Sequence, residues 1–74
     1  MTERATMIRL RINGVEDEVG ASTLAELLKH QGIDLQARFL AVAINGAVIR
    51  RADWLAHPLS PGDEVEIVRP LQGG

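Results

Sequence analysis

The chain has 74 residues, the size of one small domain, and its formal net charge is −2. Hydrophobic residues make up 46% of the chain, enough for one core, and Phe39 and Trp54 are its only aromatic residues. The lack of cysteine excludes disulfides, thiolate metal sites and a nucleophilic thiol. Without a basic run, nucleic-acid binding is not expected, and no stretch has the length and hydrophobicity of a membrane span or signal peptide. We therefore expect one cytoplasmic domain covering residues 1–74.

The first predicted element is a β-hairpin. Residues 7–12 alternate between apolar and charged side chains, the period of a half-buried strand. Asn13-Gly14 predicts a two-residue turn because both residues tolerate positive φ, and residues 15–19 return as a second strand. Pairs of opposite charge across the two strands contribute about 0.2–1 kcal/mol each and favour this register. The side chains predicted to face inward are Ile8, Leu10, Ile12, Val15 and Val19, and the predicted outer pairs join Arg9 and Arg11 to Glu16 and Glu18.

A short helix follows, with signals at both ends. Thr23 and Glu26 match a capping box, in which Thr23 is the N-cap and Glu26 reaches back to it. Gly32 stands where a left-handed residue closes a helix, with Ile33 placed to pack back on Leu28. A helix of about eight residues is not stable alone, so it must lie on a sheet. Leu24, Leu27 and Leu28 form its predicted apolar stripe, and Ala25, Glu26 and Lys29 are predicted to face water.

The second half of the chain contains three more predicted strands, over residues 40–44, 47–49 and 64–68. Asn45-Gly46 forms a second hairpin turn, and both Asn-Gly pairs are predicted to act only as turns. Residues 50–55 form a short helical turn, and Pro61-Gly62-Asp63 is a further turn. Inward side chains are predicted at Leu40, Val42, Ile44, Trp54, Leu55, Val65 and Ile67, with Ala41 and Ala43 on the other face.

The order ββ-α-ββ-(short helix)-β specifies an α+β domain with about five strands and one main helix on one face of a mixed sheet. The first and last strands are predicted to lie side by side in the sheet centre, which is the β-grasp arrangement of ubiquitin. Pro70 cannot continue a strand, and Gly73-Gly74 gives a bare, flexible end. Residues 69–74 therefore form a tail that spans roughly 20 Å when extended.

Several segments together carry a family resemblance. They are Ile12-Asn13-Gly14, residues 23–28, residues 42–46, residues 48–54, residues 62–67 and Gln72-Gly73-Gly74. Over essentially its whole length the chain resembles the ThiS family, the ubiquitin-like sulfur carriers of bacterial thiamine synthesis. The most specific feature is the Arg51…Trp54 step combined with a terminal Gly-Gly on so short a chain. One departure is Arg50, where proline is common in the family, and it affects the entry to the short helix.

The resemblance implies a carrier that is a co-substrate and not an enzyme. In this family an E1-like, ThiF-type adenylyltransferase joins the C-terminal carboxylate to AMP from ATP, and a sulfur donor enzyme then converts it to a thiocarboxylate. Gly74 would carry the sulfur to a ThiG-type thiazole synthase. The resemblance thus implies no catalytic residue, no metal and no bound cofactor, since the partner enzyme uses the ATP. We expect a monomer when the carrier is free.

The predicted site lies at and beside the tail. Gly74 is the sulfur-carrying residue, with Gly73 as its slender neighbour and Gln72 and Leu71 completing the tail; Leu71 is either a partner-pocket anchor or an exposed leucine. Partner binding is predicted at Ala41, Ala43, Val68 and Arg69, and His30 and His57 are predicted to be surface residues without metal. Three alternatives stay open: a sulfur carrier of another pathway such as the small subunit of molybdopterin synthase, a non-catalytic β-grasp interaction module, and a ubiquitin-like protein tag.

Overall fold

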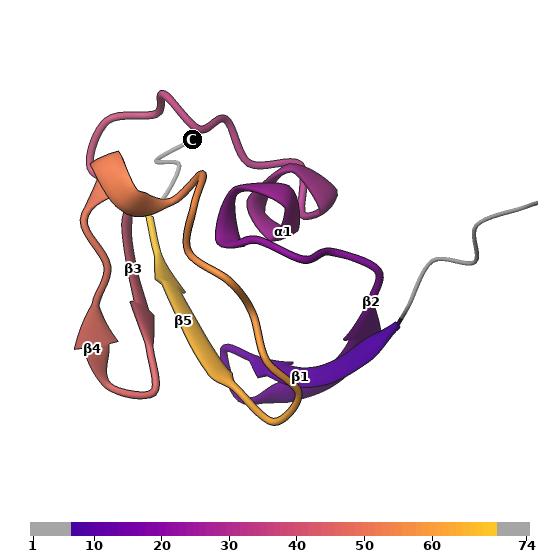
Figure 1. The fold of residues 1–74 in the computed structure, drawn as a ribbon. Coiled ribbons are helices and arrows are strands. Elements are labelled where there is room, and N and C mark those ends of the chain that lie inside the picture. Colours follow the sequence, from indigo (N-terminus) through magenta and orange to yellow (C-terminus); the bar gives the residue numbers. More distant parts are fainter. Residues whose placement is uncertain (1–6, 70–74) are drawn as a thin grey trace, which may run out of the picture.

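The alternating and helical segments of the sequence form one mixed sheet and one main helix in a computed structural model, which describes residues 7–69 (Figure 1). The elements are β1 Ile8–Ile12, β2 Val15–Val19, α1 Leu24–His30, β3 Ala41–Ile44, β4 Ala47–Val48, the 3-10 helix η1 Arg51–Asp53 and β5 Glu64–Val68. The sheet order is β2-β1-β5-β3-β4, with β1 and β5 parallel and the other neighbours antiparallel. The predicted β-grasp topology is confirmed.

The core lies between α1 and the concave face of the sheet, which curves around the helix (Figure 1). Burying a leucine or valine side chain fully contributes about 1.5–3 kcal/mol, so this single cluster holds the seven-residue helix in place. Ala25, predicted to face water, is buried, because the segment around Trp54 lies against this side of the helix and the Ala25 N–H donates to the Trp54 carbonyl. The most deeply buried side chains are Leu10, Leu24, Leu27, Leu28, Val42 and Val65.

Both ends of α1 are capped, and the N-terminal cap includes Ser22 in addition to the predicted residues. The Thr23 hydroxyl oxygen accepts a bond from the Glu26 N–H at 3.3 Å, as expected for an N-cap. The Glu26 carboxylate reaches back as predicted, and it also accepts from the N–H (2.8 Å) and the hydroxyl (3.0 Å) of Ser22. Thr23 in addition forms a β-bridge with Pro58. At the other end, Gly32 has φ +74 and Ile33 N–H donates to the Leu28 carbonyl, which confirms the predicted C-terminal motif.

The Glu26 cap makes stability depend on pH. The hydrogen bonds from Ser22 hold the pKa of the Glu26 carboxyl below its ordinary value of 4.5. A carboxyl whose pKa is lower in the folded chain adds stability above its unfolded pKa and loses it as the pH falls through the folded pKa. We therefore expect the difference in unfolding free energy between the wild type and Glu26→Gln to be largest near neutral pH and to shrink below pH 4.5.

Urea denaturation at a series of pH values measures this difference. Glu66→Gln is the matched control, because the Glu66 carboxylate bonds to no side chain or backbone group of residues 7–69. A Glu26→Gln difference that stays constant from neutral to acid pH would show that the carboxylate is not a cap.

Two apolar side chains predicted to face the core point to solvent instead. Val15 is 67% exposed, because it lies at the hairpin tip of an edge strand, whereas α1, about 10 Å long at 1.5 Å per residue, covers only part of the sheet. Leu55 is 73% exposed, since Trp54 alone fills the position at the core edge and is 3% exposed. Arg50 has φ −64, a value that proline also takes, so a proline would fit the backbone conformation at the entry to η1.

Candidate functional site

β5 is the strand that leads into the predicted tail, and it is bonded along both sides. It pairs with β1 on one side and with β3 on the other. β1 ends at Ile12, but the side chain of Asn13 continues the ladder: its Oδ1 accepts from the Ile67 N–H at 2.8 Å and its Nδ2 donates to the Ile67 carbonyl at 3.3 Å. One amide side chain thus satisfies both backbone groups of Ile67, one residue before the strand ends.

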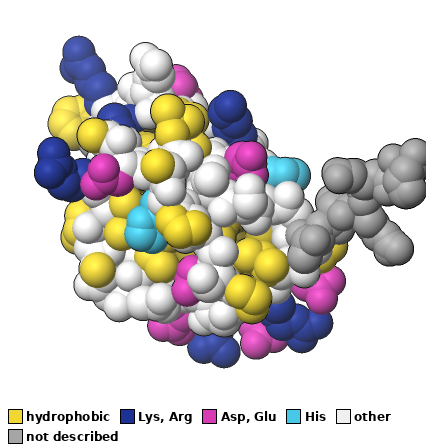
Figure 2. Space-filling model, viewed as in Figure 1, with side chains coloured by type: hydrophobic (Ala, Val, Ile, Leu, Met, Phe, Trp, Pro, Cys, Tyr) yellow, Lys and Arg dark blue, Asp and Glu magenta, His cyan; other side chains and the backbone are white. Residues whose placement is uncertain are grey.

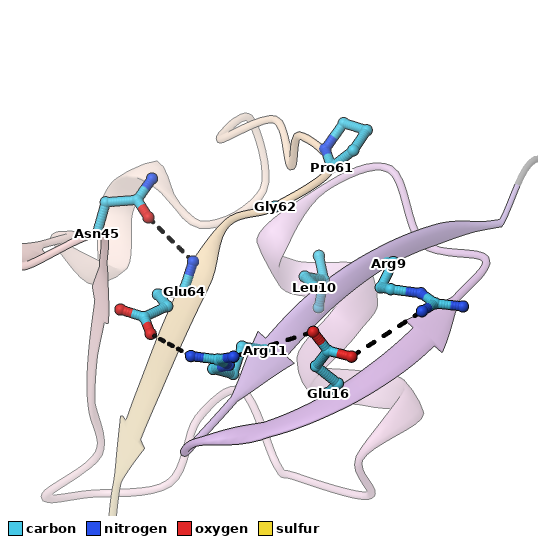
Figure 3. Close-up of a pocket in the computed structure, with 8 residues that line it drawn as sticks. All are labelled: Arg9, Leu10, Arg11, Glu16, Asn45, Pro61, Gly62 and Glu64. Carbon is cyan, nitrogen blue, oxygen red and sulfur yellow. Dashed lines mark hydrogen bonds and ion pairs between the residues drawn. The ribbon is translucent and has the colours of Figure 1, made fainter.

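The second turn asparagine holds the other end of β5. The Asn45 Oδ1 accepts from the Glu64 N–H at 2.9 Å (Figure 3). Its Nδ2 donates to the Asp63 carboxylate at 3.0 Å. Both asparagines have positive φ, as the hairpin turns require. The prediction that the two Asn-Gly pairs serve only as turns is therefore wrong, because their side chains also fix β5 at both ends.

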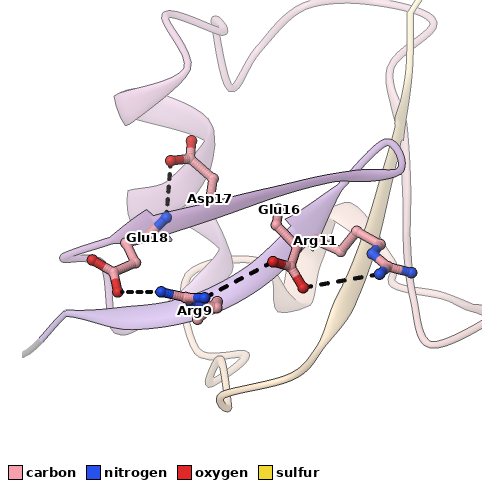
Figure 4. A network of polar contacts seen from close by, with 5 residues as sticks. All are labelled: Arg9, Arg11, Glu16, Asp17 and Glu18. Carbon is pink, nitrogen blue, oxygen red and sulfur yellow. Dashed lines mark hydrogen bonds and ion pairs between the residues drawn. The ribbon is translucent and has the colours of Figure 1, made fainter.

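The outer face of β1, β2 and β5 carries a ladder of exposed ion pairs (Figures 3 and 4). Arg9 lies 3.1 Å from Glu18, and Arg11 lies 3.3 Å from Glu64, while Glu16 stands 3.9 Å from each arginine. The hydrogen bond and charge of Glu18 raise the pKa of the Arg9 guanidinium. Exposed ion pairs contribute little to stability, so the ladder is a solvated face. The strand pairing confirms the predicted hairpin register.

Next to this ladder the sheet presents an apolar patch. Ala41 is the direct cross-strand partner of Val68, and Ala43 is the partner of Val48 on β4 and of the exposed Glu66 on β5. Directly paired residues of neighbouring strands share a face, so the structure brings three of the predicted binding residues together and adds Val48, which the sequence analysis missed. Val68 is 63% exposed, and Arg69 follows it as an exposed cation. We call Ala41, Ala43, Val48 and Val68 the sheet patch; its role in binding stays a prediction.

Comparison with known proteins places the chain in a family. The sequence profile of the ThiS family matches residues 10–74. The chain belongs to the ThiS family. The crystal structure of the thiamine biosynthesis protein ThiS from Geobacter metallireducens is 33% identical, with a TM-score of 0.73 over 90% of this chain and 100% of that chain. The NMR structure of a thiamine biosynthesis protein from Geobacter metallireducens is 30% identical, with a TM-score of 0.73 over 90% and 88% of the two chains. No curated protein matches.

In this ThiS-family chain the Arg51…Trp54 step has a structural role. The Arg51 guanidinium lies 4.7 Å from the centre of the Trp54 ring, a cation–π distance. It also donates to the carbonyl of Leu35 and, at 2.6 Å, to that of Ala37. Trp54 is a packing residue, as predicted, and its indole N–H donates to the Ile49 carbonyl at 2.9 Å. Arg51 therefore ties the loop before β3 to η1.

The remaining site predictions of the ThiS resemblance fall in two groups. Leu71, Gln72, Gly73 and Gly74 lie within the family match but outside the described residues. His30 is exposed and His57 half-buried, and within residues 7–69 no group of three or more His, Asp or Glu side chains is placed to hold a metal.

Across the described residues 7–69 no helix has the length and apolar character needed to cross a membrane. Acidic and basic side chains are interspersed on the face shown in Figure 2.

Proposed function

We propose that the protein is a sulfur carrier of thiamine biosynthesis, with Gly74 as the terminal residue that carries the sulfur. The main support is that the ThiS-family match continues beyond β5 through Gly74. β5, the strand that precedes the tail, is bonded on both sides and held by two asparagine side chains. The thiamine biosynthesis proteins of similar structure support the same pathway. A rigid strand followed by a slender end suits a chain that delivers its last residue into another protein.

The chemistry needs activation because a carboxylate is a poor electrophile. An E1-like enzyme joins the Gly74 carboxylate to the α-phosphate of ATP, and pyrophosphate leaves. Sulfide (HS⁻) delivered by a donor enzyme then attacks the carbonyl carbon of the acyl-adenylate, the carbon–oxygen bond to AMP breaks, AMP leaves, and loss of the sulfur-bound proton gives the thiocarboxylate. The carrier supplies no acid, base, metal or bound cofactor. Its contribution is to position one acyl group in the partner's site.

The body of the domain supplies the binding energy for this positioning. The sheet patch docks on the partner enzyme, and Arg69 pairs with acidic groups at the entrance that receives the tail. An extended chain of six residues spans roughly 20 Å, so residues 69–74 reach a buried active site while the sheet stays on the enzyme surface. Glycine at the last two positions lets the backbone approach atoms that a Cβ would block.

The pathway is tested by partner capture. We expect the purified protein to retain a ThiG-type thiazole synthase and a ThiF-type adenylyltransferase from a lysate, and to support ATP–pyrophosphate exchange by that adenylyltransferase. Retention of a molybdopterin synthase large subunit in place of thiazole synthase would assign the carrier to another pathway. Isopeptide conjugates of the chain to lysate proteins would indicate a protein tag.

A further inference from the structure

Phe39 combines two features that are unusual for a large aromatic residue. Its φ is +56, in the left-handed region, where a bulky side chain is an outlier. Its side chain is also 78% exposed, the highest value among the large exposed hydrophobic residues of the described chain. Asn13 and Asn45 share the positive φ, but they occupy hairpin turns and belong to a residue type that tolerates it. Phe39 lies with Arg38 in a turn before β3, but phenylalanine is not a residue type that favours such a position, and its side chain is not part of the core.

The surroundings of Phe39 force this conformation. The following residue, Leu40, is buried in the core, and β3 begins at Ala41. On the other side, Arg51 holds the carbonyls of Leu35 and Ala37. Strained residues persist where the surrounding structure fixes them, and they gather at functional positions. The residues before and after Phe39 are thus held in place, while its side chain stays exposed to solvent.

The strand register places Phe39 beside the start of the tail. β3 and β5 are antiparallel, and Ala41 pairs with Val68 at the end of β5. Phe39, two residues before Ala41, therefore lies at the end of the sheet where β5 finishes and the chain continues to Arg69. Val68, a member of the sheet patch, lies at this same exit, and the exposed cations Arg38 and Arg69 adjoin Phe39 and Val68 in sequence.

We propose that Phe39 is an aromatic anchor that enters an apolar, acid-rimmed pocket of the adenylating enzyme, next to the entrance for the tail. The proposal rests on the proposed function, since the enzyme that receives residues 70–74 must contact the end of the sheet at which β5 finishes. Buried aromatic side chains surrounded by weaker contacts carry most of the energy of such interfaces, and the flanking arginines complement an acidic rim. The sheet patch, built from alanines and valines, supplies that surrounding surface.

Exchange kinetics with the ThiF-type adenylyltransferase test the anchor. Phe39→Asn removes the ring and keeps a residue that tolerates positive φ. We expect its apparent KM for the carrier to rise by about tenfold or more, which is about 1.4 kcal/mol. We expect kcat to stay within about twofold, because a contact that stabilises the bound ground state and the transition state equally changes KM and leaves kcat unaltered. The melting temperature should equal or exceed that of the wild type, since strain is relieved.

Two further variants serve as controls. Phe39→Tyr keeps the ring and should keep the wild-type KM. Val15→Asn makes the same kind of change at a 67% exposed residue on the far edge strand and should also leave KM unchanged. An unchanged KM for Phe39→Asn, or a lowered melting temperature that explains a raised KM, would overturn the anchor. Absence of exchange with the unaltered protein would instead refute the proposed function, and the anchor with it.

Discussion

Deletion of Gly74 is expected to abolish carrier-dependent ATP–pyrophosphate exchange by the adenylating enzyme while the domain stays folded. The deletion moves the carboxylate back by one residue, about 3.3 Å of extended chain. A displacement of 1 Å from the reactive geometry can cost about 10²-fold in rate, so we expect exchange to fall by at least that factor. The core, the strand pairing and both asparagine contacts lie within residues 7–69, so the melting temperature should not change.

Gln72→Ala is the matched control for this deletion. It alters the same tail but keeps its length and its terminal glycines, and it should retain exchange. If exchange persisted after loss of Gly74, the terminal carboxylate would not be the reacting group. The chain would then fit the interaction module better than the carrier.

Asn13→Ala is expected to give the largest loss of stability among the site residues. The substitution removes both hydrogen bonds to the Ile67 backbone and leaves those groups without partners, which costs about 1–3 kcal/mol. It also places alanine at φ +50, where a left-handed residue costs about 1–2 kcal/mol. Together we expect a fall of about 2–5 kcal/mol in the free energy of unfolding, with a drop in melting temperature of about 4–8 °C per kcal/mol.

Asn13→Gly separates the two contributions, because glycine keeps the turn conformation and lacks the amide. Its loss should correspond to the hydrogen bonds alone, about 1–3 kcal/mol. Chemical denaturation of both variants gives the comparison. A loss below about 0.5 kcal/mol for Asn13→Ala, the range of neutral surface substitutions, would show that the amide does not hold β5.

Local patterns in the sequence were sufficient to predict the topology. Alternation and the two Asn-Gly pairs located the hairpins, and the helix length required a sheet beneath it. The placement of the first and last strands side by side followed from the order of elements. The errors concern contacts between distant segments. The exposure of Val15, Ala25 and Leu55 depends on how far α1 and the segment around Trp54 extend over their neighbours. The alternation of apolar and polar residues within one segment does not predict that extent.

The site was predictable to a similar degree. Alternation placed Ala41, Ala43 and Val68 outward, and the register then brought them together. The asparagine contacts could not be predicted, because Asn13 and Ile67 are 54 residues apart and meet only when β1 lies beside β5. The left-handed conformation of Phe39 has no sequence signal of its own, since arginine and leucine flank it without a turn motif. The roles of residues 71–74 rest on the sequence and on the family match.

The most direct test of the carrier is the mass of its last residue. The protein is incubated with the adenylyltransferase, ATP and the sulfur donor enzyme, and its C-terminal peptide is measured by mass spectrometry. We expect a species in which one oxygen of the Gly74 carboxylate is replaced by sulfur, formed only when ATP is present. A peptide that retains both oxygens under these conditions, while a known carrier is converted in the same assay, would contradict the proposed function.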